Sequence, residues 1–236
     1  MKTEKAKNYK RKSLIKNFYD NGFVFIKNEI PKPLLKKIKD EWNRIFIIKT
    51  GYSMNEGVKL LNKTNKKLLY KICLGLPKSK DFLKVFEIAC KRYFQIYDKK
   101  NTFCLDNSLI PGIPNDKRLV YNFHQESQYY PNIENVLTVW FPIFFTANKK
   151  NGSMSALLGS HKLGRINNTT TEGKQNGFKS YVPNKIDMLK ENYKEILYEA
   201  QLGDVVYFHQ NLLHKSNSNS TKNCRIIGQF RIADNI

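Results

Sequence analysis

Apolar residues change their spacing about 100 residues into the chain. Before that point they recur every three or four positions, as in an amphipathic helix. The clearest such stretch runs from Leu34 to Ile48 and follows Pro31 and Pro33, which suit a helix start. Weaker helical stretches span residues 13–19, 67–74 and 82–97, and one short strand spans residues 23–26. The first hundred residues are therefore predicted to be mainly helical.

Beyond residue 100, short β-rich runs alternate with turn residues. These runs span residues 102–109, 119–123, 136–145, 153–158, 205–208 and 225–232. Such spacing is typical of a β-sandwich or barrel. Nothing in the sequence resembles an interdomain linker. We therefore expect a single domain over residues 1–236, in which a mainly helical part, residues 1–100, packs on a β core formed by residues 101–236.

A polar stretch from Leu163 to Glu191 interrupts the β pattern. It is rich in Asn, Thr, Lys and Gly. Long loops in compact domains are often lids or binding loops. We expect this stretch to be a loop that covers a site, or else a surface insertion without a role.

Composition narrows the class of protein. Aromatic residues make up 13% of the 236 residues, which favours a sizeable buried core. No run of 18 apolar residues predicts a membrane span, and the basic first residues lack the apolar segment of a signal peptide. The cysteines, Cys73, Cys90, Cys104 and Cys224, are too far apart for a zinc motif or a disulfide framework. A reducing, cytoplasmic location is expected.

The charge is strongly basic, with 41 Lys and Arg against 20 Asp and Glu and a net charge of +21. Such an excess can indicate a nucleic acid or an anionic small molecule as partner. Most of the basic residues are Lys and are spread along the chain, whereas nucleic-acid sites favour Arg for its bidentate fork. We therefore attribute the charge mainly to composition, place an anionic substrate second and consider nucleic acid unlikely.

The histidines suggest chemistry. His124 and Glu126 lie two positions apart at the end of an expected strand, so their side chains would project from one face. A second strand that ends at His214 could supply a third ligand. Two histidines and one carboxylate with open coordination positions suit a non-haem Fe(II) oxygenase. The His-x-Glu pair alone is a weak signal, because it also occurs by chance.

The surrounding residues strengthen this interpretation. Arg225 lies eleven positions after His214, and Ser216 lies two positions after it. Four further landmarks precede them: Tyr19-Asp20-Asn21-Gly22-Phe23, Trp140, Asn151-Gly152-Ser153-Met154 and Gly159-Ser160-His161-Lys162. Over roughly residues 15–233 this order resembles the phytanoyl-CoA dioxygenase family of Fe(II)/2-oxoglutarate oxygenases. The resemblance implies a mainly β fold, a double-stranded β-helix (a cupin-like jelly roll) with helices packed on its major sheet.

The resemblance also implies roles for individual residues. His124, Glu126 and His214 match the metal ligands. Arg225 matches the arginine that binds the distal carboxylate of 2-oxoglutarate, and Ser216 matches a hydroxyl at the same carboxylate. In addition, Trp140 falls near a tryptophan of the cosubstrate pocket, and Gln125, which lies beside the ligands in the family's His-Gln-Asp position, is expected to contact the cosubstrate as well.

This sequence departs from the family pattern at two positions. Glu126 stands where Asp is usual, and Leu158 replaces the proline before Gly159-Ser160-His161. Glu still provides a carboxylate, so the position is filled and hydroxylation is favoured over halogenation. The extra methylene group must be accommodated by the backbone.

Several residues compete for these roles. His209 is the rival of His214, but its spacing to Arg225 is wrong, and His161 is expected to bind a loop. Arg231 is the rival of Arg225. Six positions apart, the two share a strand face, so parity cannot choose between them and only the spacing from His214 favours Arg225. Four aromatic residues could line a substrate pocket or belong to the core: Phe123, Tyr129, Tyr130 and Trp140.

The resemblance implies an enzyme that uses Fe(II), 2-oxoglutarate and O2 to hydroxylate a small molecule. The substrate is unidentified. An anionic substrate would be linked to CoA, phosphate or a nucleotide, or be a natural-product or surface-sugar intermediate. The alternatives are a non-catalytic jelly-roll binding protein with a degenerate site and a basic nucleic-acid-binding module, for which no recognisable motif is present.

Overall fold

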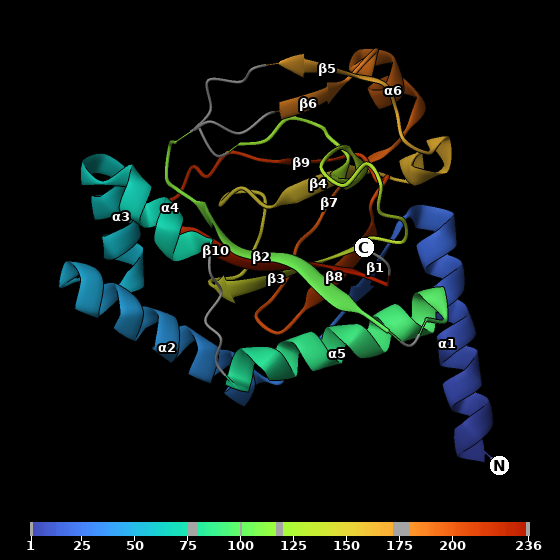
Figure 1. Ribbon diagram of the computed structural model, residues 1–236, viewed down its shortest axis with the longest axis horizontal. Helices are drawn as coiled ribbons and strands as arrows, with labels where there is room; N and C mark the ends of the chain where they lie inside the picture. Colours follow the sequence, from blue (N-terminus) through green and yellow to red (C-terminus); the bar gives the residue numbers. More distant parts are fainter. Residues whose placement is uncertain (1, 75–79, 100, 117–119, 172–179, 235–236) are drawn as a thin grey trace.

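The computed structural model describes residues 2–74, 80–99, 101–116, 120–171 and 180–234. Two β-sheets lie at the centre, with the helices of residues 32–50 and 80–97 along one side and a small hairpin on the opposite side (Figure 1). The helices are α1 (Lys2–Asn21), α2 (Lys32–Thr50), α3 (Met54–Thr64), α4 (Lys66–Cys73), α5 (Lys80–Tyr97) and α6 (Ile186–Asn192), with short 3-10 helices η2 (Glu126–Gln128) and η3 (Ser160–Leu163). The strands are β1 (Phe23–Ile26), β2 (Phe103–Gly112), β3 (Leu137–Phe144), β4 (Met154–Leu157), β5 (Asn168–Thr171), β6 (Ser180–Pro183), β7 (Glu195–Leu197), β8 (Val205–His209), β9 (His214–Ser216) and β10 (Arg225–Ala233).

The strands form a major and a minor sheet. The major sheet has the order β1-β8-β3-β10-β2, and the minor sheet has the order β7-β4-β9. The strands pair antiparallel with their neighbours in both sheets. Strands β5 and β6 pair as a separate hairpin. This arrangement, with helices on the major sheet, confirms the mainly β jelly-roll core that the sequence predicted.

The alternating direction of side chains along each strand of the major sheet determines which of them face the helices. In β10, Ile226 and Phe230 pack in the core shared with the helices, whereas Ile227 packs in a second core between the sheets. Successive side chains of a strand point to opposite faces. Arg225 and Arg231 therefore share the face of Ile227, toward the minor sheet, and this face carries the chemistry.

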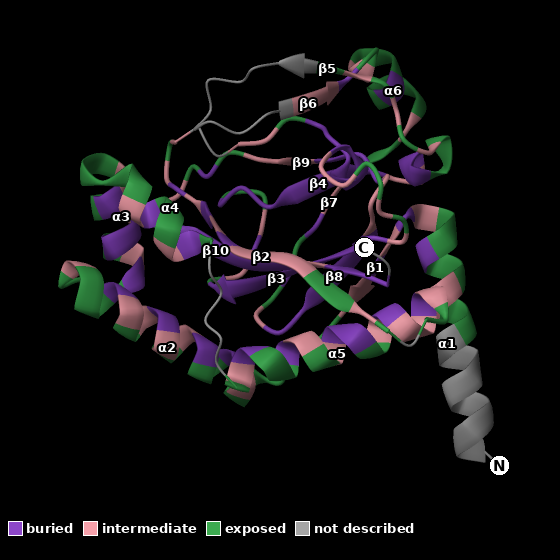
Figure 2. Ribbon diagram, viewed as in Figure 1, coloured by how far each residue is buried: buried purple, intermediate pink, exposed green. Residues whose placement is uncertain are grey.

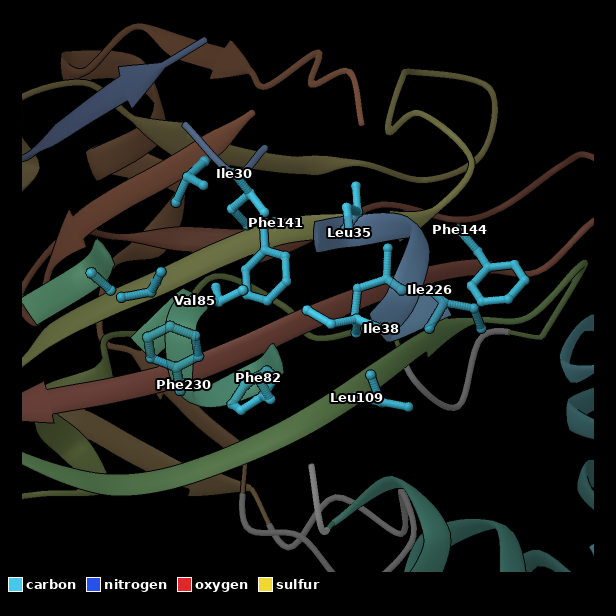
Figure 3. Close-up of a cluster of buried hydrophobic side chains, with 14 of the residues drawn as sticks. Ile30, Leu35, Ile38, Phe82, Val85, Leu109, Phe141, Phe144, Ile226 and Phe230 are labelled. Carbon is cyan, nitrogen blue, oxygen red and sulfur yellow. The ribbon is translucent and has the colours of Figure 1, made fainter. Parts of the chain in front are cut away.

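The helical layer is fastened to the sheet by aromatic packing. Figure 3 shows Phe82 of α5 beside Phe230 and Phe141 of the sheet, with Ile38 of α2 nearby. The Phe82 and Phe141 rings lie 5.6 and 5.9 Å from the Phe230 ring, both in edge-on geometry. Buried residues follow the inner side of α2 and α5 (Figure 2). Such contacts hold the back of the sheet rigid, so side chains on its other face keep fixed positions.

The expected elements agree with the structure along most of the chain. The expected strand at residues 23–26 is β1, and the expected helix at Leu34–Ile48 lies within α2. Helix α3 and strands β7 and β9 were not expected. No described helix is long and apolar enough to cross a membrane.

Two expectations about local structure were wrong. Of the expected strand at residues 119–123, residue 119 lies outside the described residues, and residues 120–123 are irregular. The stretch Leu163–Glu191 is not a structureless loop, because its described residues include β5, β6 and most of α6, although residues 172–179 lie outside them. The hydrogen bonds between β5 and β6 are contacts that a polar composition does not reveal.

Candidate active site

His124 and His214 lie side by side in a small antiparallel bridge. Each backbone N–H donates to the carbonyl of the other residue, at 3.0 and 3.1 Å. The two imidazole rings are 4.2 Å apart between centroids. We expected His214 to end a strand, but it begins β9. The preceding strand, β8, ends at His209. The bridge between two distant segments therefore brings the two rings together.

Glu126 completes a triad with the two histidines. It opens η2, directly after the extended residue Gln125. One potential ligand atom from each of His124, Glu126 and His214 lies within 4.8 Å of the others. His214 Nε2 is 3.2 Å from Glu126 Oε1, and the two side chains are 6% and 1% exposed. This is the spacing of a metal site with two histidines and one carboxylate.

Backbone carbonyls orient both imidazoles. His124 Nδ1 lies 2.7 Å from the carbonyl oxygen of Asn122, and His214 Nδ1 lies 3.0 Å from that of Leu212. A carbonyl oxygen only accepts, so each Nδ1 carries the proton and donates it. Each Nε2 is then left with its lone pair free for a metal ion.

The electrostatics favour the metal-binding protonation states. Burial, together with the neighbouring His214, lowers the pKa of His124 to about 3. Burial opposes the charge of Glu126, but the Arg231 guanidinium and the two imidazoles outweigh it and lower the pKa of this carboxyl well below its usual range. Near neutral pH the site therefore presents a neutral His124 and an anionic carboxylate, the forms that bind divalent metals.

The triad lies in the wall of a cavity of about 550 Å³. Trp140 of β3, Ser216 of β9 and Arg225 of β10 also line this cavity. His214 and Ser216 are two positions apart on β9 and so point the same way. The structure thus brings together six of the seven residues that the resemblance singled out.

Arg225 is a buried cation without a partner among the described residues. Arg225 is 4% exposed, and its Nε has no hydrogen-bond partner among the described residues. Burial lowers its pKa to about 10, because the charged form is poorly solvated. Gly112 lies opposite it on β2, and a Cβ added there would come within 2.8 Å of Nε and Nη2. No described carboxylate pairs with this guanidinium, which is therefore suited to the far carboxylate of a dicarboxylate cosubstrate.

Gln125 does not fit the cosubstrate role that the resemblance suggested. Its side-chain Nε2 donates to the carbonyls of Gly164 and Asn211, and its Oε1 accepts from the N–H of Ile166. It is fully buried and is absent from the cavity lining. Because the side chains on either side of it point into the cavity, Gln125 points away from it and ties two loops together.

The competing residues separate clearly. His161 donates from Nε2 to the carbonyl of Tyr19 and His209 accepts at Nδ1 from the N–H of Asn211, so both serve local structure. Arg231 donates to Glu126 and to Asp106.

Of the four aromatic residues, Tyr129, Tyr130 and Trp140 line the cavity, whereas Phe123 packs in a small satellite core.

Sequence reasoning missed two features of this site. The Arg231 bridge between Glu126 and Asp106 joins residues more than 100 positions apart. The space that Gly112 leaves for Arg225 depends on the register between β2 and β10. No local signal in the sequence pointed to the second, because Gly112 lies beyond the β-rich run expected at residues 102–109 and is the last residue of β2.

A Gly112→Ala substitution tests this space directly. The new methyl group would displace the flexible guanidinium of Arg225, so we expect the Kd for 2-oxoglutarate to rise roughly tenfold, as measured by calorimetric titration of the metal-loaded protein. Metal affinity and thermal stability should change little, because the triad does not contact Gly112. Unchanged 2-oxoglutarate affinity would show that the space is not needed.

Comparison with known proteins agrees with this geometry. A model of the phytanoyl-CoA dioxygenase family matches residues 18–227. Human peroxisomal phytanoyl-CoA dioxygenase is 24% identical over 232 residues, which covers 89% of this chain and 64% of the human protein. The chain thus corresponds to less than two thirds of that relative's length.

Solved structures share the fold. The epimerase SnoN, in complex with Fe3+, α-ketoglutarate (2-oxoglutarate) and nogalamycin RO, has a TM-score of 0.68 at 12% identity and covers 96% of this chain and 84% of its own. EctD from S. alaskensis with bound Fe has a TM-score of 0.64 at 11% identity, over 94% of this chain and 75% of its own. These likenesses confirm the fold. The family match over most of the chain confirms the resemblance seen in the sequence: the protein belongs to the phytanoyl-CoA dioxygenase family.

Proposed function

We propose that the protein is an Fe(II)- and 2-oxoglutarate-dependent dioxygenase that hydroxylates a small molecule. One observation carries the proposal: a triad of His124, Glu126 and His214 shares a cavity with the guanidinium of Arg225, whose buried Nε has no partner among the described residues. The triad fits Fe(II), and Arg225 fits the distal carboxylate of 2-oxoglutarate.

Each residue then has a definite task. The triad holds the metal by two imidazole nitrogens and one carboxylate oxygen. Arg225 and the Ser216 hydroxyl bind the far end of the cosubstrate, and Trp140 forms part of the wall beside it. When bound, iron and 2-oxoglutarate supply the chemistry that inserts an oxygen atom from O2 into a C–H bond and releases succinate and CO2. The chain orients the reactants and excludes water.

The charges of the cavity support an anionic substrate. Its lining includes Lys66, Lys67, Arg225 and Arg231 against Asp106 and Glu126 only. Arg231 pairs with both carboxylates. With Arg225 assigned to 2-oxoglutarate, Lys66 and Lys67 at the start of α4 remain, and neither forms an ion pair with any described residue. A carboxylate or phosphate group of the substrate beside α4 would balance them.

The experiment that tests the function combines activity with substrate discovery. The protein with Fe(II) and 2-oxoglutarate is incubated with metabolite fractions separated by anion exchange. We expect one component of a retained fraction to gain the mass of one oxygen atom, and we expect no gain with the His214→Ala variant. If the protein binds iron and 2-oxoglutarate but forms no succinate with any fraction, the alternative of a non-catalytic binding protein gains support.

The nucleic-acid alternative rests on charge alone. The basic residues are mostly Lys and are distributed along the chain, and the cavity gives a more specific use for two of them. Any DNA or RNA affinity with a steep dependence on salt would revive this alternative.

A cytoplasmic location stays part of the proposal, supported by the four cysteines, all of which are free.

The hairpin of β5 and β6 is our candidate for a cover over the cavity. It lies on the side of the sheets opposite α2 and α5 (Figure 1). Tyr181 of β6 packs edge-on against Tyr129, with ring centroids 5.0 Å apart, and Tyr129 lies 6.0 Å from the His124 ring in the same geometry. Tyr129 also lines the cavity. A described strand of the hairpin is thus linked to the metal ligand through one aromatic side chain.

A Tyr181→Ala substitution tests the cover. Removing an edge-on aromatic pair costs about 0.5–1.5 kcal/mol, so the closed state should lose up to roughly tenfold in population. We expect substrate hydroxylation to fall while 2-oxoglutarate decay without hydroxylation persists or rises, as measured by the ratio of product to succinate. The control is Met188→Ala, which replaces an exposed residue of α6. A wild-type ratio in the Tyr181 variant would rule the cover out.

A further inference from the structure

The two carboxylate oxygens of Glu126 have different partners. Oε1 faces His214 Nε2 at 3.2 Å, inside the group of potential metal ligands. Oε2 accepts a hydrogen bond from Arg231 Nε at 2.7 Å. The Glu126 side chain is 1% exposed, so both oxygens are shielded from bulk solvent. One oxygen is therefore free to face a metal ion, and the other is already engaged.

Arg231 is itself anchored, so it is a fixed partner for Oε2. Its Nη1 lies 2.8 Å from both carboxylate oxygens of Asp106, which also accepts a hydrogen bond from the Tyr130 hydroxyl. When the Gln229 amide is turned so that its oxygen rather than its nitrogen faces Arg231, that oxygen accepts from Nη2 at 2.5 Å. All three nitrogens of the Arg231 guanidinium thus have an acceptor, whereas the Nε of Arg225 has none among the described residues.

The pairing of β10 with β2 holds Arg231 and Asp106 next to each other. Arg231 of β10 and Asp106 of β2 are direct neighbours across the sheet, and the ladder shifts register immediately after Arg231. Such an irregularity re-aims a side chain. The back of β10 is packed against the helices through Phe230. If the Glu126 carboxylate rotated, Arg231 would have to give up its hydrogen bonds to Asp106 in order to follow it.

A glutamate can bind a metal ion through one oxygen or through both. The difference matters at this site, because two positions on the metal are needed for 2-oxoglutarate and one for O2. A second oxygen from Glu126 would occupy one of them. Glu126 also has one methylene group more than the aspartate usual in the family, so its carboxylate has more freedom to turn both oxygens toward the metal.

We propose that Arg231 is a positioning residue that keeps Glu126 a one-oxygen ligand and thereby preserves the third open coordination position. This inference rests on the proposed metal site. Arg231 does not touch the metal or the cosubstrate. It acts by holding Oε2 at the end of a bridge anchored on Asp106.

Counting the water molecules on bound Mn(II) tests the inference without activity. Mn(II) favours octahedral coordination by oxygen and nitrogen, and paramagnetic resonance in isotope-labelled water reports how many waters it carries. We expect three waters in the wild-type protein without 2-oxoglutarate and two in Arg231→Leu, because Glu126 then binds through both oxygens. Mn(II) affinity should not fall, since a cation beside the ligand has been removed.

The matched control is Arg225→Leu, which removes a buried arginine from the same face of the same strand. It should keep three waters. Arg231→Lys and Asp106→Asn are milder variants that serve if Arg231→Leu does not fold, and both should give a mixture of the two hydration states.

The outcomes separate this inference from the proposed function. Three waters in the Arg231 variants, with or without weaker Mn(II) binding, would overturn the positioning role and leave Arg231 a purely structural residue. Two waters in the wild-type protein would overturn it as well. A wild-type protein that binds no Mn(II), or binds it equally well as His214→Ala, would instead contradict the metal site itself and with it the proposed function.

Discussion

Replacing either His124 or His214 with alanine will abolish iron binding and 2-oxoglutarate turnover. Both Nε2 atoms are freed for the metal by the hydrogen bonds that each Nδ1 donates to a carbonyl. Two remaining ligands cannot hold a labile divalent ion, so we expect a loss of iron affinity of at least 100-fold, on the order of 3 kcal/mol or more. Equilibrium dialysis against Fe(II) under anaerobic conditions measures the loss, and succinate release measures turnover.

Glu126→Ala and His209→Ala complete this series. The glutamate variant should also lose turnover, with a milder loss of affinity because water or an anion can replace one carboxylate. His209→Ala should keep both affinity and turnover, since His209 Nδ1 is engaged with Asn211. Full activity in His214→Ala together with loss in His209→Ala would show that the ligand assignment is wrong.

Replacing Arg225 with alanine will raise the Kd for 2-oxoglutarate about 30-fold or more. Breaking a buried, hydrogen-bonded charge pair costs roughly 2–5 kcal/mol, and about 2 kcal/mol already corresponds to 30-fold. Iron affinity should change little, because Arg225 is not a ligand. Titration of the iron-loaded protein with 2-oxoglutarate under anaerobic conditions, followed by visible absorption, measures the change.

Arg231→Ala is the informative comparison for this prediction. Its guanidinium is fully occupied by Glu126, Asp106 and Gln229, so its loss should change the metal coordination first. If 2-oxoglutarate affinity stays normal in Arg225→Ala and fails in Arg231→Ala without a change at the metal, the cosubstrate role belongs to Arg231.

The core strands could be predicted from the sequence because alternate residues along each strand pack in the same core. In β3 the residues Leu137, Val139, Phe141 and Ile143 all pack in the core shared with the helices, while Trp140 between them faces the other core. Such a pattern is local and needs no knowledge of partners. β9 was not visible, because three residues that pair with β4 show no period of their own.

The site was predictable only as far as spacing along the chain determines it. His124 and Glu126 are neighbours in sequence, and the family resemblance supplied His214 and Arg225. Parity could not separate Arg225 from Arg231, because the two share a strand face. What separates them is a contact of Arg231 with Glu126, 105 positions away. For the same reason Gln125, adjacent to the ligands in sequence, was misplaced: its side chain points away from the cavity to the loops.

The most direct test of the central claim is the fate of isotope-labelled O2. The protein is supplied with Fe(II), 2-oxoglutarate and labelled O2, and succinate is analysed by mass spectrometry. The proposed function predicts succinate that carries one labelled oxygen atom, at a rate that depends on both cofactors and is absent in His214→Ala. A protein that binds Fe(II) and 2-oxoglutarate but yields no labelled succinate above the level of that variant, even with the metabolite fractions present, would contradict it.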